Sequence, residues 1–453
     1  MLVNADVDER GTLRPLEATT GGGLVDDAMV IDGDGHLMEP PDMWSARMDA
    51  EKWGDWIPHV DDEGTFSIGG VARIGGPGIN EEVARINGVT VEELFESYAR
   101  TMSSTDTAGG HDPHARIKAM DADGLDVAVM YPTKSLQFGP CDPIAAIREH
   151  PEFVADCHRA YNDWASEYCT AAPDRLFAIA AVPLQDVELA VAEAERAVST
   201  LGLKGIAIRP SAYQFAGPAR SGTGIPGAGP SGRLPLNDDL PFSNRVYDPF
   251  WAACQDLDVP VGLHPIAHVD TPGANRKFGL LRDHASLNMT NSACDEDHGG
   301  SALGQAIGNP VDMIVSMGRL LMGGVCERFP SLRFVFLESG GGWCPTQLER
   351  MDEQLEAFPL EGRRLSMMPS EYFRRQCYIS FDPGEWNLAA SAEFIGADRV
   401  IWASDFPHPE YTPDVVDKLK AALAPLPEAD QRKILGTNAA DAYRLPVGRT
   451  LKV

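Results

Sequence analysis

The sequence has no run of eighteen or more apolar residues, which is the length that a membrane-spanning helix needs. Its first thirty residues carry acidic charges and lack the apolar segment of a signal peptide. Its eight cysteines are scattered without a C-x-x-C pair, which favours reduced thiols over a disulfide framework or a zinc finger. These absences predict a cytoplasmic protein that does not enter a membrane.

Positive charge is also scarce. With 38 Lys and Arg against 67 Asp and Glu, the formal charge is −29, which argues against nucleic acid or an anionic membrane as a partner. An anionic small molecule stays compatible with this charge, since one cation inside a pocket can outweigh a distant surface field. The 453 residues, 43% of them apolar, are enough for one large globular domain or two to three smaller ones.

Eight short apolar segments run along the chain, and amphipathic segments with helical periodicity separate most of them. They are near-continuously apolar rather than alternating, as expected of parallel strands that are buried on both faces. Neither G-x-G-x-x-G nor a Walker loop follows any of them, which weakens a nucleotide-binding doubly wound sheet as the alternative. The pattern therefore predicts an α/β fold, a distorted (β/α)8 barrel. The expected strands are 29–34, 126–132, 176–183, 205–210, 259–265, 332–339, 377–382 and 399–405, and the expected helices 142–171, 187–202, 247–258, 304–330, 344–358 and 413–424.

The segments outside this pattern set the domain organisation. Residues 1–28 lack apolar periodicity and read as an N-terminal arm, followed by a single barrel domain over 29–453. Long insertions are expected after strands 1, 4 and 5, at 35–125, 211–246 and 266–303. The second insertion is rich in Gly, Pro and Ser, and is either a lid over the barrel mouth or a plain surface excursion.

Polar residues stand where the expected strands end, which is where barrel enzymes carry their chemistry. Asp34 and His36 are two apart on an extended segment, so their side chains point the same way. Buried without partners, such groups would cost several kcal/mol each. Together with His264 and Asp405 they form a nitrogen and oxygen donor set that fits one Zn²⁺, with a position left for water. Mn²⁺ and Co²⁺ are the alternative ions.

Other polar and aromatic residues allow two readings each. Arg209 ends the fourth strand and either forms a surface salt bridge or clamps a substrate carboxylate. Trp343, like Trp53 and Trp56, either lines an apolar substrate pocket or packs into the core. Asp382 is interpreted as a turn residue before Pro383 and Gly384. The remaining histidines considered, His111, His114 and His298, are interpreted as loop residues.

The motifs that contain these residues resemble the amidohydrolase superfamily, and within it the branch that includes aminocarboxymuconate semialdehyde decarboxylase. The resemblance spans about Met29 to Leu445. It implies a distorted barrel with one catalytic divalent metal, held by Asp34, His36, His264 and Asp405. Binuclear members carry a carboxylated lysine where this chain has Arg209, which fits a mononuclear site. Relatives often pair through insertions of this kind, so the resemblance also implies a homodimer. The motifs are "DGDGHLMEP", "MDADGLDVAVMYPT", "LGLKGIAIRP", "VPVGLHP", "FVFLESGGGW", "IWASDFPHPE" and "ILGTNAADAYRL".

The preferred hypothesis is metal-assisted hydrolysis, in which water attacks the carbonyl of an amide, ester or lactone in a small-molecule or peptide-like substrate. Asp405 or Glu338 would be the general base, and Glu338 could instead bind the metal or orient His264. His408 is either a substrate contact and proton donor or a loop histidine. The decarboxylase branch usually has a histidine where this chain has Glu338, and a carboxylate is a better base than proton donor.

The alternative hypothesis is metal-dependent, non-oxidative decarboxylation of an aromatic or unsaturated carboxylic acid, the reaction of the best-known relatives. A third class, a metal-binding protein without turnover, remains because fold alone does not guarantee function.

Overall fold

The eight barrel strands predicted from the sequence are all present in the computed structural model. In chain order they are β3 (Ile31–Leu37), β7 (Val127–Pro132), β8 with β9 (Leu176–Ala178, Ala180–Ala181), β10 (Ile206–Ile208), β13 (Val261–Leu263), β14 (Phe334–Phe336), β15 (Cys377–Phe381) and β16 (Val400–Trp402). The structure describes residues 6–7, 13–14, 25, 27–61, 66–74, 81, 84–85, 88–93, 107–138, 145–210, 214–215, 239–265, 304–408 and 411–447.

The barrel is closed but distorted, because its strands belong to two parallel sheets. One has the order β16-β15-β14-β13-β10-β9 and the other β3-β7-β8. The third barrel strand is shared between them, and at its interruption the Ile179 N–H donates to the Met130 carbonyl at 2.9 Å. On the other side, the loop after β16 meets β3 through two backbone hydrogen bonds, Asp405 N–H to Asp34 O at 3.0 Å and His36 N–H to Phe406 O at 2.7 Å.

The strands are apolar at almost every position because both of their faces are covered. On β7, Val127 and Val129 pack inside the barrel with Ile31 and Val335, whereas Ala128 and Met130 pack outward in the layer under the helices. Side chains alternate between the two faces of a strand, so two buried faces require a continuous apolar run. This explains why the sequence signal was a run rather than an alternation.

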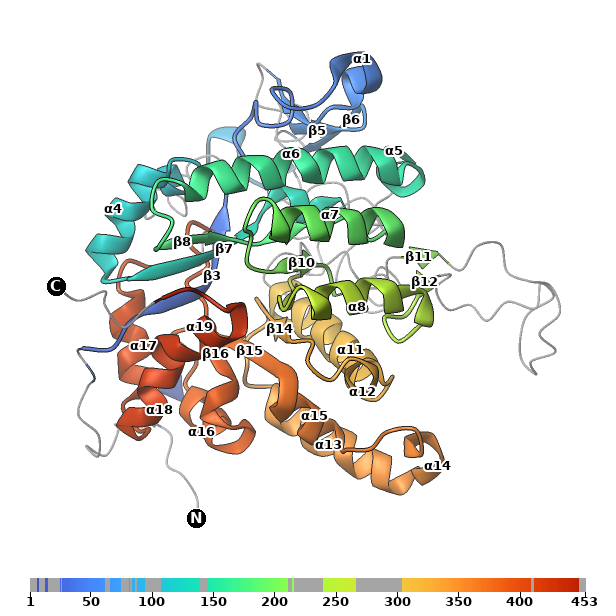
Figure 1. The fold of residues 1–453 in the computed structure, drawn as a ribbon. Helices are drawn as coiled ribbons and strands as arrows, with labels where there is room; N and C mark the ends of the chain where they lie inside the picture. The colour runs from blue at the N-terminus through green and yellow to red at the C-terminus, as the bar shows by residue number, and fades with distance from the viewer. Residues whose placement is uncertain are drawn as a thin grey trace.

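Helices surround the strands, with α6, α7 and α8 lying side by side on one flank and α16, α17 and α18 gathered near the C-terminal strand (Figure 1). The helix expected over 142–171 is divided, because Pro151 begins α6 and disfavours helical geometry at His150, whose ψ is 75°. The helix expected over 304–330 is divided as well, into η7, α11 and α12. The helix bounds are α4 (Pro113–Asp123), α5 (Ala145–Glu149), α6 (Pro151–Cys169), α7 (Val187–Ser199), α8 (Asp248–Asp256), η7 (Gly304–Gly308), α11 (Asn309–Leu321), α12 (Val325–Arg328), α13 (Cys344–Ala357), α14 (Pro359–Gly362), α15 (Pro369–Gln376), α16 (Leu388–Ile395), α17 (Val415–Leu423), α18 (Glu428–Arg432) and α19 (Asn438–Tyr443).

The first part of the insertion after the first strand lies beside α6, on its outer side (Figure 1). It contains α1 (Ala50–Trp53) and an antiparallel sheet of β4 (His59–Val60), β5 (Phe66–Ile68) and β6 (Val71–Ile74). Trp53 and Trp56 stack at 6.0 Å and contact Phe153 of α6, so their role here is packing. In the insertion after the fourth strand, β11 (Gln214–Phe215) pairs with β12 (Asp239–Leu240).

Most of the 211–246 insertion, on which the lid interpretation depends, lies outside the described residues, and so does His298. Among the helices that are described, none is both long and apolar enough to cross a bilayer.

Candidate metal centre and active site

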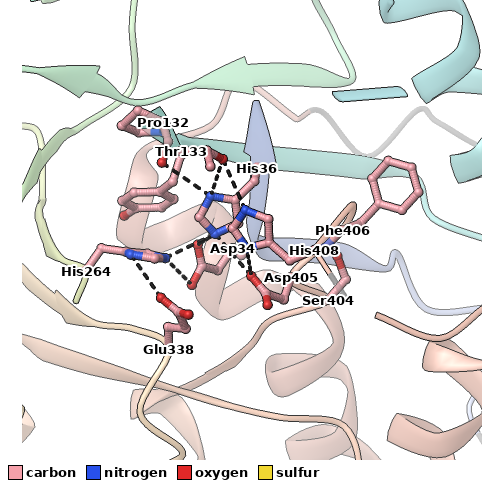
Figure 2. A network of polar contacts seen from close by, with 12 residues as sticks. Asp34, His36, Pro132, Thr133, His264, Glu338, Ser404, Asp405, Phe406 and His408 are labelled. Atoms are coloured by element: carbon pink, nitrogen blue, oxygen red, sulfur yellow. Dashed lines mark hydrogen bonds and ion pairs between the residues drawn. The ribbon is translucent and has the colours of Figure 1, made fainter. Parts of the chain in front are cut away.

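Asp34 and His36 project from the end of β3 into the mouth of the barrel, where they meet His264 from the end of β13 and Asp405 from the end of β16 (Figure 2). The register of β3 shifts between Asp32 and Gly35, so the strand carries a bulge at the start of the site. A bulge re-aims side chains at a functional site. Asp34, His36 and His264 are at most 2% exposed, so their polar atoms need partners within the protein or a bound ligand.

The two imidazoles present acceptor nitrogens to one another. His264 Nδ1 lies 2.8 Å from Pro265 O, and His36 Nδ1 lies 3.3 Å from Pro132 O. A carbonyl can only accept, so each ring carries its proton on Nδ1 and a lone pair on Nε2. The two Nε2 atoms are nevertheless 3.1 Å apart, and His36 Nε2 is 3.1 Å from the Asp405 carboxylate. Three acceptors converge on one point, an arrangement that suits a bound cation.

Burial and neighbouring charges shift the pKa values of the ionisable groups in this cluster. Burial, and the nearby His408, lower the pKa of His36 to about 4, and burial together with His36 lowers the pKa of His264 well below its usual value. Burial and the negative charge of Asp405 raise the pKa of Asp34 well above its ordinary range. Neutral imidazoles are the form that binds metals, and a divalent ion would favour ionised Asp34.

The residues present therefore fit a divalent metal. Asp34 Oδ1 is buried and accepts no hydrogen bond from the described residues, although it lies 3.9 Å from His36 Nε2. Asp34 Oδ2 is 3.8 Å from His264 Nε2. Two imidazole nitrogens and two carboxylates make a donor set that suits zinc, manganese or related ions. The four residues predicted as ligands thus lie around His36, in two overlapping groups: Asp34, His36 and His264 form one, and His36, Asp405 and His408 form the other.

Glu338 and His408 flank this cluster on opposite sides (Figure 2). Glu338 Oε2 lies 3.2 Å from His264 Nδ1, so the carboxylate accepts the same proton that Pro265 O accepts and orients the ring. His408 stacks on His36 with ring centroids 4.0 Å apart, and its Nδ1 lies 3.0 Å from Asp405 Oδ1. Burial opposes the ionisation of Asp405, but His408 and His36 outweigh it, so the pKa of Asp405 is lowered.

Two buried charged residues beneath the site, Asp32 and Arg116, were not found from the sequence. Asp32, next to the bulge, accepts from the Ser404 N–H at 3.0 Å and from its hydroxyl at 2.5 Å. Arg116 of α4 donates to the backbone carbonyls of His36 and Phe406, and to that of Gly109. Its charge also acts on Asp32. Asp32 and Arg116 thus tie the end of the first strand to the end of the last.

One sequence signal could have revealed Arg116. It lies four residues before the apolar Met120 on α4, so the two share one face of that helix, which is buried. A charge on such a face needs a buried partner.

The other predicted residues occupy defined places. Arg209 follows β10 and is 3% exposed, which excludes the surface salt bridge. Trp343 is half-buried, and its indole N–H donates to Ser339 O at 3.2 Å. Asp382 is exposed in the turn after β15, as expected, and His111 and His114 are exposed at the start of α4.

The fold and the donor set define a metal-dependent enzyme built on a barrel. The Amidohydrolase family model matches residues 31–445, so the chain belongs to that family. The resemblance to its branch with aminocarboxymuconate semialdehyde decarboxylase is confirmed.

Known relatives are similar over most of the chain. A gamma-resorcylate decarboxylase of Rhodococcus jostii is 29% identical over 339 residues, which cover 73% of this chain and 87% of the relative. An amidohydrolase structure from Mycobacterium avium subsp. paratuberculosis superposes with a TM-score of 0.65 at 22% identity, covering 92% of this chain and 100% of that one. A 5-carboxyvanillate decarboxylase of Novosphingobium aromaticivorans, complexed with manganese, superposes with a TM-score of 0.58 at 19% identity, covering 95% and 99%.

These relatives bear on the sequence-based hypotheses unequally. They favour the alternative hypothesis of a decarboxylase over the preferred one of a hydrolase. One divalent metal is supported, whereas zinc as the particular ion is not, since the carboxyvanillate decarboxylase is described with manganese.

Proposed function

We propose that this protein is a metal-dependent, non-oxidative decarboxylase of an aromatic carboxylic acid. The observation that carries the proposal is the convergence of two imidazole acceptors and two carboxylates at the barrel mouth. This arrangement occurs in a chain that is 29% identical to an aromatic acid decarboxylase over most of its length.

Asp34, His36, His264 and Asp405 would hold the ion, with manganese favoured and zinc as the alternative. The ion would bind the substrate carboxylate or an adjacent oxygen and draw electron density from the reacting carbon. The protein supplies the rest. Arg209, buried at the end of β10, would pair with a substrate oxygen through its planar guanidinium. Trp343, with its indole fixed on Ser339 O, would flank the ring of the substrate.

The chemistry needs one proton for each CO₂ released. The bond between the ring carbon and the carboxylate carbon breaks, its electron pair stays on the ring carbon, and that carbon takes a proton. His408 is suited to deliver the proton, because Asp405 orients its ring and balances a positive charge on it. The Thr133 hydroxyl lies 3.1 Å from His408 Nε2 and can donate or accept, so it serves the ring in both protonation states.

Hydrolysis is the second candidate, and one observation favours it. His408 and His36 hold Asp405 ionised, and an ionised carboxylate beside a metal is what a water-activating base requires. A homodimer, a cytoplasmic location, and an arm at 1–28 before one domain at 29–453 also remain proposals. Light scattering of the purified protein tests the homodimer.

The experiment that separates the two candidates uses the metal-loaded enzyme in a mixture of D₂O and H₂¹⁸O. Aromatic acids such as 2,6-dihydroxybenzoate and 5-carboxyvanillate are offered beside aryl esters and amides. Decarboxylation predicts CO₂ and an arene with one deuterium at the carbon that lost it. Uptake of ¹⁸O into the carboxylic acid released from an ester or amide, without CO₂ from any acid, would overturn the proposal in favour of hydrolysis.

A further inference from the structure

The loop after β14 carries Glu338 to His264 in a conformation that needs support. Glu338 has φ of +46°, a left-handed backbone that a non-glycine residue adopts at a cost of about 1–3 kcal/mol. Gly340, two residues on, is also left-handed, with φ of +61°. This backbone persists only if its surroundings hold it, and the position of the Glu338 carboxylate depends on it.

The support comes from the loop after β15. The Glu385 carboxylate accepts the Gly341 N–H at 3.0 and 3.1 Å and the Gly342 N–H at 3.1 Å. It also accepts the N–H of Asp382, in its own loop, at 2.9 Å. Successive N–H groups that point into one concavity form an anion-binding nest, so the carboxylate clamps the two loops together.

The two loops lie too close for any larger residue to enter. A Cβ atom on Gly341 would lie 2.1 Å from the ring of Phe381, and one on Gly342 would lie 1.9 Å from the amide of Asn387. The Gly run is therefore in contact with the seventh strand and its loop. Glu385 fixes the position of the Gly341 and Gly342 backbone along this contact.

We propose that Glu385 is a positioning residue: its carboxylate holds the N–H groups of Gly341 and Gly342 and thereby fixes the backbone from which Glu338 reaches His264. The catalytic consequence rests on the proposed function, whereas the clamp itself does not. Glu385 touches no predicted metal ligand in the described part of the chain, so it acts through Glu338.

The charge of Glu385 makes this clamp sensitive to pH. Burial, and the negative charge of Asp382 in the same loop, raise the pKa of Glu385 to about 7. From the facing loop the groups that meet its oxygens are backbone N–H groups, and the carboxylate of that loop, Glu338, is engaged with His264. Protonation of the Glu385 carboxylate turns one acceptor oxygen into an O–H donor. This donor faces a backbone N–H, which then loses its hydrogen bond. The clamp therefore weakens as the pH falls below about 7.

The first test measures amide hydrogen exchange in residues 340–343 of the full-length, metal-loaded protein. Glu385→Gln is a neutral mimic, since its amide can accept from one side only. We expect the Gly341 and Gly342 amides to exchange at least about tenfold faster in this variant at pH 8, because one acceptor oxygen is replaced by an NH₂ group that faces an N–H donor. The matched control is Glu393→Gln, an exposed glutamate on α16, which should exchange like the wild type. Unchanged exchange in Glu385→Gln would overturn the clamp.

The second test is a double-mutant cycle on turnover. Glu385→Gln should lower kcat more than it raises KM, and the fall in wild-type kcat below about pH 7 should disappear in it. If Glu385 acts through Glu338, then Glu338→Gln combined with Glu385→Gln loses no more activity than Glu338→Gln alone. Losses that multiply would refute the positioning role. If no variant turns over any acid, the proposed function fails, and the exchange measurement still decides the clamp.

Discussion

Asp405 and Glu338 end two different barrel strands with the same left-handed backbone, at φ +58° and +46°. One side chain faces His36 and the other accepts from His264, so each imidazole meets a carboxylate that stands on left-handed backbone. Asparagine tolerates this conformation better than most residues, which makes Asp405→Asn a substitution that removes charge with little change of backbone.

Asp405→Asn should therefore fold and fail to function. The variant keeps the size of the side chain but loses the charge that faces His36 and the ion. We expect metal affinity to fall by more than the roughly 10–100-fold that follows loss of a group that merely supports a ligand. Metal analysis after dialysis, with activity on the aromatic acid, measures this. The control is Asp398→Asn, which removes a half-exposed carboxylate and should retain metal and activity.

Removal of the metal should abolish activity and lower stability together. A ligand that binds the folded state at 100 times its Kd contributes about 2.7 kcal/mol, so a chelator should lower the midpoint of thermal unfolding. Added Mn²⁺ or Zn²⁺ should restore both, and the ion that restores more turnover is the working one. Full activity in a chelated, metal-free sample would contradict the assignment of the site.

His408→Asn should separate chemistry from metal binding. Both ring nitrogens of His408 already have partners, Asp405 and Thr133, so its loss should leave the ion in place. We expect kcat to fall by about 10²–10⁴-fold, the usual contribution of a general acid or base, with metal content near that of the wild type. The exposed His114 provides the control as His114→Asn. Loss of the metal would instead make His408 a ligand.

Arg116→Met should destabilise the fold as a whole. The substitution strips donors from the backbone carbonyls of Gly109, His36 and Phe406. Leaving buried hydrogen-bonding groups without their partner costs about 1–3 kcal/mol each, which urea unfolding measures. Arg374→Met removes an exposed arginine on α15 and should change stability by no more than about 0.5 kcal/mol. Equal effects of the two would mean that the buried hydrogen bonds of Arg116 do not support the fold.

Through Glu385, stability should fall as the pH rises towards 7, whereas activity should rise over the same range. Burial and Asp382 raise the pKa of Glu385 to about 7, above its ordinary value of 4.5, so folding favours the protonated form. As the pH rises from about 4.5 to about 7, the wild type should lose stability that Glu385→Gln keeps. Chemical unfolding of both proteins across this range measures the difference. A difference that does not change with pH would contradict it.

Much of the architecture could be predicted from the sequence because burial on two faces leaves a strong local signal. Each barrel strand is a short apolar run, and the ligands stand at the ends of such runs. The breaks in helices were harder to see. Pro151 marks one, yet the long amphipathic pattern on both sides of His150 concealed it.

The supporting residues of the site could not be predicted, because they act through backbone groups distant in sequence. Glu385 meets Gly341 across more than forty residues of sequence, and Asp32 meets Ser404 across 372 residues of sequence. Alternation on a regular strand would place Asp32 on the same face as Asp34. The bulge in β3 breaks that alternation, and no local sequence pattern predicts the bulge.

The junction between β3 and the loop after β16 also limits where new chain termini can be placed in this enzyme. The two backbone hydrogen bonds described there come from Asp405 and His36, which are themselves predicted metal ligands. The same two residues thus close the ring of strands and supply donors to the predicted metal site. A circular permutant opened between residues 403 and 407 should keep most of its apolar interior and still lose its ion, whereas new termini in an exposed loop on the opposite side should spare it.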